Sequence, residues 1–133
     1  PEALVIGSDQ VCALGDVVLG KPGDAAAARD QLASQSGRIV CFHTAVAIVG
    51  IAAGCWRQHV DETRCVFRSL DAAEISAYID AESPLDCAGS FKVEGLGIAL
   101  FERVETVDPS ALVGLPLIWV AQALRELRAT PAG

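Results

Sequence analysis

The segment from Ile39 to Trp56 carries no formally charged side chain and is rich in Val and Ile. Such a run needs an apolar environment, which a lipid bilayer or the interior of a folded domain supplies. His43 interrupts the run, and Gly50 and Gly54 break it, so it does not suit a helix that faces lipid. The pattern instead predicts two long strands covered on both faces, joined by a turn, and no membrane span.

The remaining patterns predict further short strands and three helices. The long strands are expected over residues 38–49 and 55–68, and the short ones over residues 4–6, 10–14, 17–19 and 98–104. Helices are expected over residues 25–36, over a segment that ends at residue 81, and over residues 117–127. Asp24 is expected to cap the first helix and Asp71 the second, and Asp108 is a further cap before Pro109. These elements predict the α/β class, with one domain over residues 1–133 and a mixed sheet flanked by helices.

The chain is acidic, with 10 Lys and Arg against 17 Asp and Glu and a formal net charge of −7. No basic stripe follows any predicted helix, which disfavours a long nucleic acid as a partner. A small anionic nucleotide is compatible with this balance, because its pocket needs only one or two local cations or a metal.

The five cysteines are scattered through apolar segments, and no two of them form a CxxC pair. An odd number without pairing predicts reduced cysteines in the core of a cytosolic protein. Cys41 with His43, or Cys55 with His59, could bind zinc, but neither pair has the spacing of a zinc site. Cys41 with His43 could also form a nucleophile and its base, but simple packing is the better interpretation.

The first candidate for chemistry is Asp9, in the segment GSDQ (residues 7–10) directly after an apolar strand. At a strand end, an Asp can bind Mg²⁺ and orient a water molecule, or act as a base. The alternative is a turn residue whose carboxylate bonds its own backbone.

Residues 15–22, GDVVLGKP, nearly match a phosphate-binding P-loop. Pro22 stands where Ser or Thr would bind magnesium, so the P-loop interpretation fails. Lys21 remains a candidate phosphate contact on a hairpin exit. The alternative is a solvated lysine before a turn proline.

The glycine-rich segment CAGSFKVEGLG (residues 87–97) contains Ser90, Lys92 and Glu94. Its glycines let the backbone approach a ligand closely. The carboxylate of Glu94 can accept hydrogen bonds from the ring N–H and the exocyclic amine of guanine. The alternative is an ordinary polar surface loop.

Taken in order, GSDQ, GKP (residues 20–22), AGSFKVEG (residues 88–95) and GLPL (residues 114–117) resemble the motifs of Maf-type nucleoside triphosphate pyrophosphatases. The subgroup acting on 7-methyl-GTP is the most similar. The resemblance implies a fold like that of inosine triphosphate pyrophosphatases, often dimeric. It also implies hydrolysis of a nucleoside triphosphate between the α and β phosphates, with Mg²⁺ or Mn²⁺, to a monophosphate and pyrophosphate.

The same resemblance implies roles for four residues. Asp9 is expected to activate water and bind the metal, Lys21 to bind phosphate, and Gln10 and Glu94 to read the base. The family's N-terminal strand and Ser-x-Ser-Pro-x-Arg-Arg phosphate loop have no counterpart in these 133 residues, so a domain lacking both is expected. Two alternatives stay open: a nucleotide-binding or oligomerisation module without catalysis, and a pyrophosphatase acting on dTTP or UTP.

Overall fold

The computed structural model describes residues 3–50 and 54–129. Its strands are β1 (Leu4–Leu14), β2 (Val17–Val18), β3 (Ile39–Gly50), β4 (Cys55–Phe67) and β5 (Phe101–Glu105). Its helices are α1 (Ala25–Gln35), α2 (Ala72–Glu82) and α3 (Leu117–Ala129), with short 3₁₀ helices η1 (Ala88–Ser90), η2 (Leu96–Leu100) and η3 (Pro109–Val113). The combination of one sheet with helices confirms the α/β class. Residues 51–53, in the predicted turn between the long strands, lie outside the described residues.

The sheet has the strand order β2-β1-β3-β4-β5, and its described pairs are all antiparallel, where the sequence predicted a mixed sheet. β1 pairs with β3 without a break, from Leu4 opposite Gly50 to Leu14 opposite Val40. The two short strands predicted over residues 4–6 and 10–14 are therefore one strand. Continuous pairing satisfies the backbone between them, and Asp9 lies in the middle of β1 rather than at a strand end.

One face of the sheet is covered and the other is open in the described part of the chain. Along β3, burial alternates strictly, with Val40, Phe42, Thr44, Val46 and Ile48 buried. We call the face that carries these residues the inner face and the opposite one the outer face. The expectation that both faces of the long strands are covered is wrong here, because large apolar side chains on the outer face are 39–63 % exposed: Val5, Val11, Trp56 and Val60.

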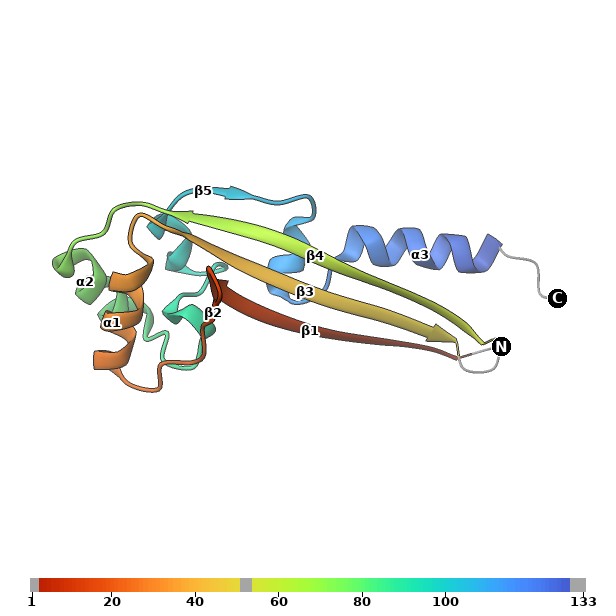
Figure 1. Cartoon of the computed structure of the whole chain (residues 1–133), viewed down its shortest axis with the longest axis horizontal. Helices are drawn as coiled ribbons and strands as arrows, with labels where there is room; N and C mark the ends of the chain where they lie inside the picture. The colour runs from red at the N-terminus through yellow and green to blue at the C-terminus, as the bar shows by residue number, and fades with distance from the viewer. Residues whose placement is uncertain (1–2, 51–53, 130–133) are drawn as a thin grey trace.

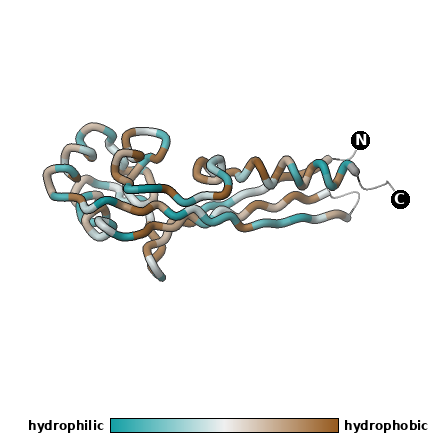
Figure 2. Tube along the Cα trace, turned by 90° about the horizontal axis from the view of Figure 1, so that it is seen from above, coloured by the Kyte–Doolittle hydropathy of each residue, from teal (hydrophilic) through white to brown (hydrophobic). Residues whose placement is uncertain are grey.

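Two apolar clusters lie on the inner face. At one end of the sheet, α1 and α2 pack over a cluster that includes four phenylalanines, whose rings meet edge to face at centroid distances of 5.0–5.5 Å. At the other end, Val46 and Ile48 pack against Val120 and Ala123 of α3. The helices α1 and α2 thus lie together at one end of an elongated sheet, and α3 runs beside the other end (Figures 1 and 2).

The two predicted caps of α1 and α2 are confirmed. The carboxylate of Asp24 accepts a hydrogen bond from the Ala27 N–H at 2.8 Å, and Asp71 accepts one from the Glu74 N–H at 2.8 Å. These bonds satisfy backbone donors that have no partner inside the first helical turn.

Asp108 joins η3 to α3. It is buried, and its carboxylate accepts hydrogen bonds from the Ser110 N–H at 3.0 Å and the Ile118 N–H at 2.8 Å. Burial alone would raise the pKa of Asp108, but a hydrogen bond from the Ser110 hydroxyl, the two N–H bonds and the nearby His59 outweigh it and lower the pKa below its usual value. The charged form therefore holds the start of α3 in place.

None of the helices within residues 3–50 and 54–129 combines the length and hydropathy that crossing a bilayer requires.

We predict that Asp108→Asn lowers the free energy of unfolding at pH 7 by about 1–2 kcal/mol, because the charge and one acceptor are lost. Since the pKa of Asp108 is lowered on folding, its contribution is present above the usual pKa and is lost as the pH falls through the folded value. The difference between wild type and variant should therefore shrink as the pH falls from about 5 toward 2.

Thermal unfolding followed by circular dichroism across this pH range measures the effect. Asp30→Asn, at an exposed position of α1, is the matched control and should leave the midpoint at pH 7 unchanged. If the difference in unfolding midpoint between wild type and Asp108→Asn does not vary with pH, the lowered pKa of Asp108 is contradicted.

Candidate functional site

Gln10 extends from the inner face of β1 toward η3. Its side-chain nitrogen donates toward Thr44 Oγ1 at 3.1 Å, the Ala111 carbonyl at 3.0 Å and the Leu112 carbonyl at 3.3 Å. These contacts hold the carboxamide at one orientation, although Gln10 is only half-buried.

The segment of residues 87–97, which carries Lys92 and Glu94, is fixed from behind by α2. The Lys92 N–H donates to the Tyr78 hydroxyl at 2.9 Å, and the Leu96 N–H donates to Glu82 Oε1 at 2.9 Å. Burial raises the pKa of Tyr78 to about 12, so the hydroxyl stays neutral. The turn that carries Glu94 is thus tied at both of its ends.

Close backbone approaches explain the glycines of this segment. A Cβ on Gly97 would collide with the backbone carbonyl of Lys92, and one on Gly95 would collide with the Glu82 carboxylate. Gly89 has φ 77°, in the left-handed region that favours glycine. The sequence predicted close approach of this backbone to a ligand, and the structure shows close approach to other parts of the protein.

A cleft of about 190 Å³ lies between the inner face of β1 and this segment. Its lining combines apolar side chains with three polar ones, Gln10, Lys92 and Glu94; the apolar part includes Phe42, Phe91 and Leu112. Pockets that enclose whole drug-sized ligands measure about 300–1,000 Å³. This cleft suits a smaller group of the size of one base, and it brings together two predicted site residues, Gln10 and Glu94.

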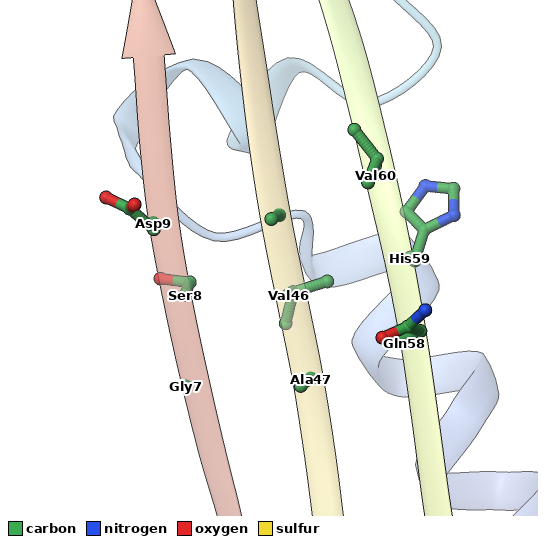
Figure 3. A pocket seen from close by; sticks show the side chains of 9 residues that line it. Gly7, Ser8, Asp9, Val46, Ala47, Gln58, His59 and Val60 are labelled. Atoms are coloured by element: carbon green, nitrogen blue, oxygen red, sulfur yellow. The ribbon is translucent and has the colours of Figure 1, made fainter.

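Asp9 lies on the outer face, in a different cavity. This cavity of about 390 Å³ is shallow and lined mainly by small or apolar residues of β1, β3 and β4, among them Gly7, Ala45, Ala47 and Val60. In Figure 3 the Asp9 carboxylate is directed away from β3, toward the free edge of β1. Its Oδ1 accepts a hydrogen bond from the Gln10 N–H at 2.9 Å, the local backbone contact that the turn-residue alternative anticipated.

The structure therefore separates Asp9 from Gln10 and Glu94. Consecutive residues of a strand point to opposite faces, so Asp9 and Gln10 cannot share one cleft while β1 stays extended. The edge of β1 offers a route between them. β2 pairs only with Ala13 and Leu14, so from Leu4 to Val11 the far side of β1 has no strand partner among the described residues.

Lys21 is exposed, in a segment that is tied to the neighbourhood of the cleft. The preceding Gly20 carbonyl accepts hydrogen bonds from the Gly89 N–H at 3.3 Å and from the Gln31 side chain at 3.1 Å. No ion pair involves Lys21 in the part of the chain that the structure describes. Its ammonium group is thus available to a ligand.

The side chains do not form a ready metal centre. Among residues 3–50 and 54–129, no group of three or more His, Cys, Asp or Glu side chains could hold a metal ion. Mg²⁺ in nucleotide enzymes commonly takes one or two protein carboxylates, with water and phosphate oxygens as its other ligands. Asp9 fits such an ion as one ligand and not as a complete site.

All five cysteines are free, as predicted. Burial raises the pKa of Cys12 and of Cys65 to about 12. Burial, aided by nearby carboxylates, also raises the pKa of Cys41 and Cys87. Because the thiolate is the reactive form, these shifts argue against a cysteine nucleophile.

Three residues that support the site were not singled out from the sequence for this role. Thr44, Tyr78 and Glu82 hold Gln10 or the segment of residues 87–97 in place. Of the three, only Thr44 could have been found from the sequence, because it is a polar residue at an inward position of a largely apolar strand.

Comparison with protein families decides the relationship. The family model described as Maf-like protein matches residues 1–127. The chain belongs to the Maf-like family. This confirms the resemblance drawn from the GSDQ, GKP, AGSFKVEG and GLPL motifs.

Several curated relatives of this Maf-like chain are named 7-methyl-GTP pyrophosphatase. This chain is 58 % identical over 118 residues to a 7-methyl-GTP pyrophosphatase of Alkalilimnicola ehrlichii, and the match covers 89 % of this chain and 59 % of the relative. Proteins of the same name from Chromohalobacter salexigens and Xanthomonas oryzae pv. oryzae are 52 % and 55 % identical, covering 100 % and 95 % of this chain. The chain spans 69 % and 65 % of those two relatives, so it corresponds to roughly three-fifths to two-thirds of their length.

We predict that Gly97→Ala destabilises the chain by about 1–3 kcal/mol, because the added methyl group meets backbone that cannot move aside cheaply. The Lys92 and Leu96 amides, which bond Tyr78 and Glu82, should then exchange faster with solvent. Urea unfolding and hydrogen exchange measure the two effects.

Gly20→Ala is the matched control, since a Cβ there meets no atom of the described residues within 4 Å. Equal stability of the two variants would show that the turn carrying Glu94 is not held as the structure indicates.

Proposed function

We propose that the protein carrying this chain is a nucleoside triphosphate pyrophosphatase that cleaves 7-methyl-GTP, or a related nucleotide, to the monophosphate and pyrophosphate. One observation carries the proposal: Gln10 and Glu94, from segments far apart in sequence, line one base-sized cleft. The names of the relatives support this choice of substrate. We infer that residues 1–133 belong to a single Maf-like domain.

The base would bind in the cleft. The Glu94 carboxylate can accept hydrogen bonds from the ring N–H and the exocyclic amine of guanine. Methylation at N7 makes the base cationic, and the exposed carboxylate of Glu94 attracts a cation. A base without these donors would lose the charge-assisted hydrogen bonds to Glu94.

The triphosphate would pass around the free edge of β1 to reach Asp9. Neighbouring strands in a sheet lie about 5 Å apart, so crossing one edge strand is a short step for an extended triphosphate. Lys21 would bind phosphate oxygens through its ammonium group. Asp9, on the outer face at that edge, would then hold and deprotonate the attacking water.

We infer Mg²⁺ or Mn²⁺ as the cofactor, with Asp9 as the ligand from the described residues. Such an ion offsets phosphate charge and lowers the pKa of a bound water. The free cysteines accord with a cytosolic protein. The apolar side chains on the outer face, Val5, Val11, Trp56 and Val60, accord with a homodimer or another contact over that face.

A second candidate is nucleotide binding without turnover. The observation that favours it is the separation of Asp9 from the cleft by β1. It predicts that 7-methyl-GTP binds with a measurable dissociation constant and that no pyrophosphate is released. A third candidate, hydrolysis of dTTP or UTP, is distinguished by substrate preference.

We predict that the natural protein containing this chain releases pyrophosphate from 7-methyl-GTP faster than from GTP, dTTP or UTP. Asp9→Asn should lower kcat by about 10²-fold or more, the usual contribution of a positioned acid or base. KM should change little. A coupled pyrophosphate assay measures both constants.

Asp16→Asn, in the exposed turn between β1 and β2, is the matched control and should retain wild-type rates. Equal rates for wild type and Asp9→Asn would remove Asp9 from catalysis. A preference for dTTP or UTP would overturn the substrate assignment, and binding without turnover would support the second candidate.

We also predict that Lys21→Gln raises KM for the triphosphate by about tenfold or more, since a charge-assisted bond contributes about 1.5–3 kcal/mol. The affinity for the free nucleoside should not change, because it lacks the phosphates. Arg29→Gln, which removes a positive charge from an exposed position of α1, is the control. Equal increases in KM for the two variants would indicate a general effect of positive charge and not a contact between Lys21 and the phosphates.

A further inference from the structure

The buried residue Thr44 links Gln10 to η3. Thr44 is 1 % exposed, and its hydroxyl lies 3.1 Å from the Gln10 side-chain nitrogen and 3.1 Å from the Ala111 carbonyl oxygen. Gln10 lines the cleft together with Glu94, whereas Ala111 is not among the lining residues. Thr44 does not itself line the cleft.

The direction of each hydrogen bond follows from the donors available. A carbonyl oxygen only accepts, so the Thr44 hydroxyl donates its proton to Ala111. The Thr44 oxygen can then only accept from Gln10, and the Leu112 carbonyl also needs a donor. The group of Gln10 that faces η3 must therefore be the NH₂ group, because a reversed carboxamide would set its oxygen against the carbonyl oxygens of Ala111 and Leu112.

This arrangement leaves the Gln10 oxygen for a ligand. Among the described residues, no hydrogen bond to Gln10 Oε1 is found, whereas the two N–H bonds of the NH₂ group have three acceptors around them. Glu94 presents only acceptors as well. The polar part of the cleft contributed by these two residues therefore matches a base edge rich in N–H donors.

We propose that Thr44 is a positioning residue that holds Gln10 with its oxygen toward the cleft, so that Gln10 accepts one hydrogen of the guanine exocyclic amine. The inference rests on the proposed function, in which Glu94 binds the ring N–H and the other hydrogen of the same amine. Thr44 thus favours guanine over hypoxanthine, which differs from guanine by lacking that amine.

The test compares equilibrium binding of 7-methyl-GMP and 7-methyl-IMP, measured by calorimetry on the natural protein containing this chain. Wild type should bind 7-methyl-GMP more tightly. Thr44→Val keeps the shape but removes the hydroxyl, and should weaken binding of 7-methyl-GMP about three- to tenfold, the range expected for one hydrogen bond. Binding of 7-methyl-IMP should not change.

Two further variants separate positioning from general damage to the fold. Thr44→Ser retains the hydroxyl and should restore the preference for 7-methyl-GMP. In a Gln10→Leu background, Thr44→Val should have no further effect on that preference, because the residue acts through Gln10. Equal weakening of both ligands by Thr44→Val, or the same loss of preference in both backgrounds, would overturn the proposal.

Turnover of 7-methyl-GTP, measured in parallel, distinguishes this inference from the proposed function. A preference for 7-methyl-GMP that depends on Thr44, without pyrophosphate release, would leave the inference standing and remove the catalytic proposal. Pyrophosphate release without that preference would leave the catalytic proposal standing and overturn the inference about Thr44. Failure to bind either monophosphate would overturn the inference directly.

Discussion

The antiparallel register of β1, β3 and β4 is the constraint on which the rest of the structure depends. It sets Asp9 opposite Ala45 and Gln10 opposite Thr44. Because side chains alternate along a strand, a slip of one residue would exchange the two faces along the whole length of β1. Burial of Val46 and Ile48 under α3 opposes such a slip, since it would bring outer-face residues of the strand to the core. The same packing that stabilises the sheet therefore assigns Gln10 to the cleft and Asp9 to the outer face.

The cleft is an assembly of several elements and not a property of one motif. β1 contributes Gln10, the segment of residues 87–97 contributes Glu94, and η3 contributes the carbonyl groups that orient Gln10. α2 holds that segment through Tyr78 and Glu82. A change in the packing of α2 would therefore reach the ligand through the backbone of this segment, although no residue of α2 lines the cleft.

The two faces of β1 suggest how one strand can serve both ends of a nucleotide. The inner face is partly dry and offers hydrogen-bond acceptors, which suits recognition of a base. The outer face and the unpaired edge are open in the described residues, which suits charged phosphates that keep much of their water. Strand alternation places these two environments one residue apart, and a ligand that crosses the edge can contact both.

The sequence alone determined the three helices, the two long strands, the caps of α1 and α2, the free cysteines and the family, because these depend on local periodicity, on short-range hydrogen bonds and on motif order. It also identified Gln10 and Glu94 as candidate site residues, although only the fold brings them together in one cleft. Only the tertiary structure decided that residues 4–14 form one strand, that Asp9 lies in its middle and on the face opposite Gln10, and that Thr44 directs the Gln10 carboxamide. These features depend on which strand pairs with which, and in what register, and such long-range choices are made by packing across the whole sheet.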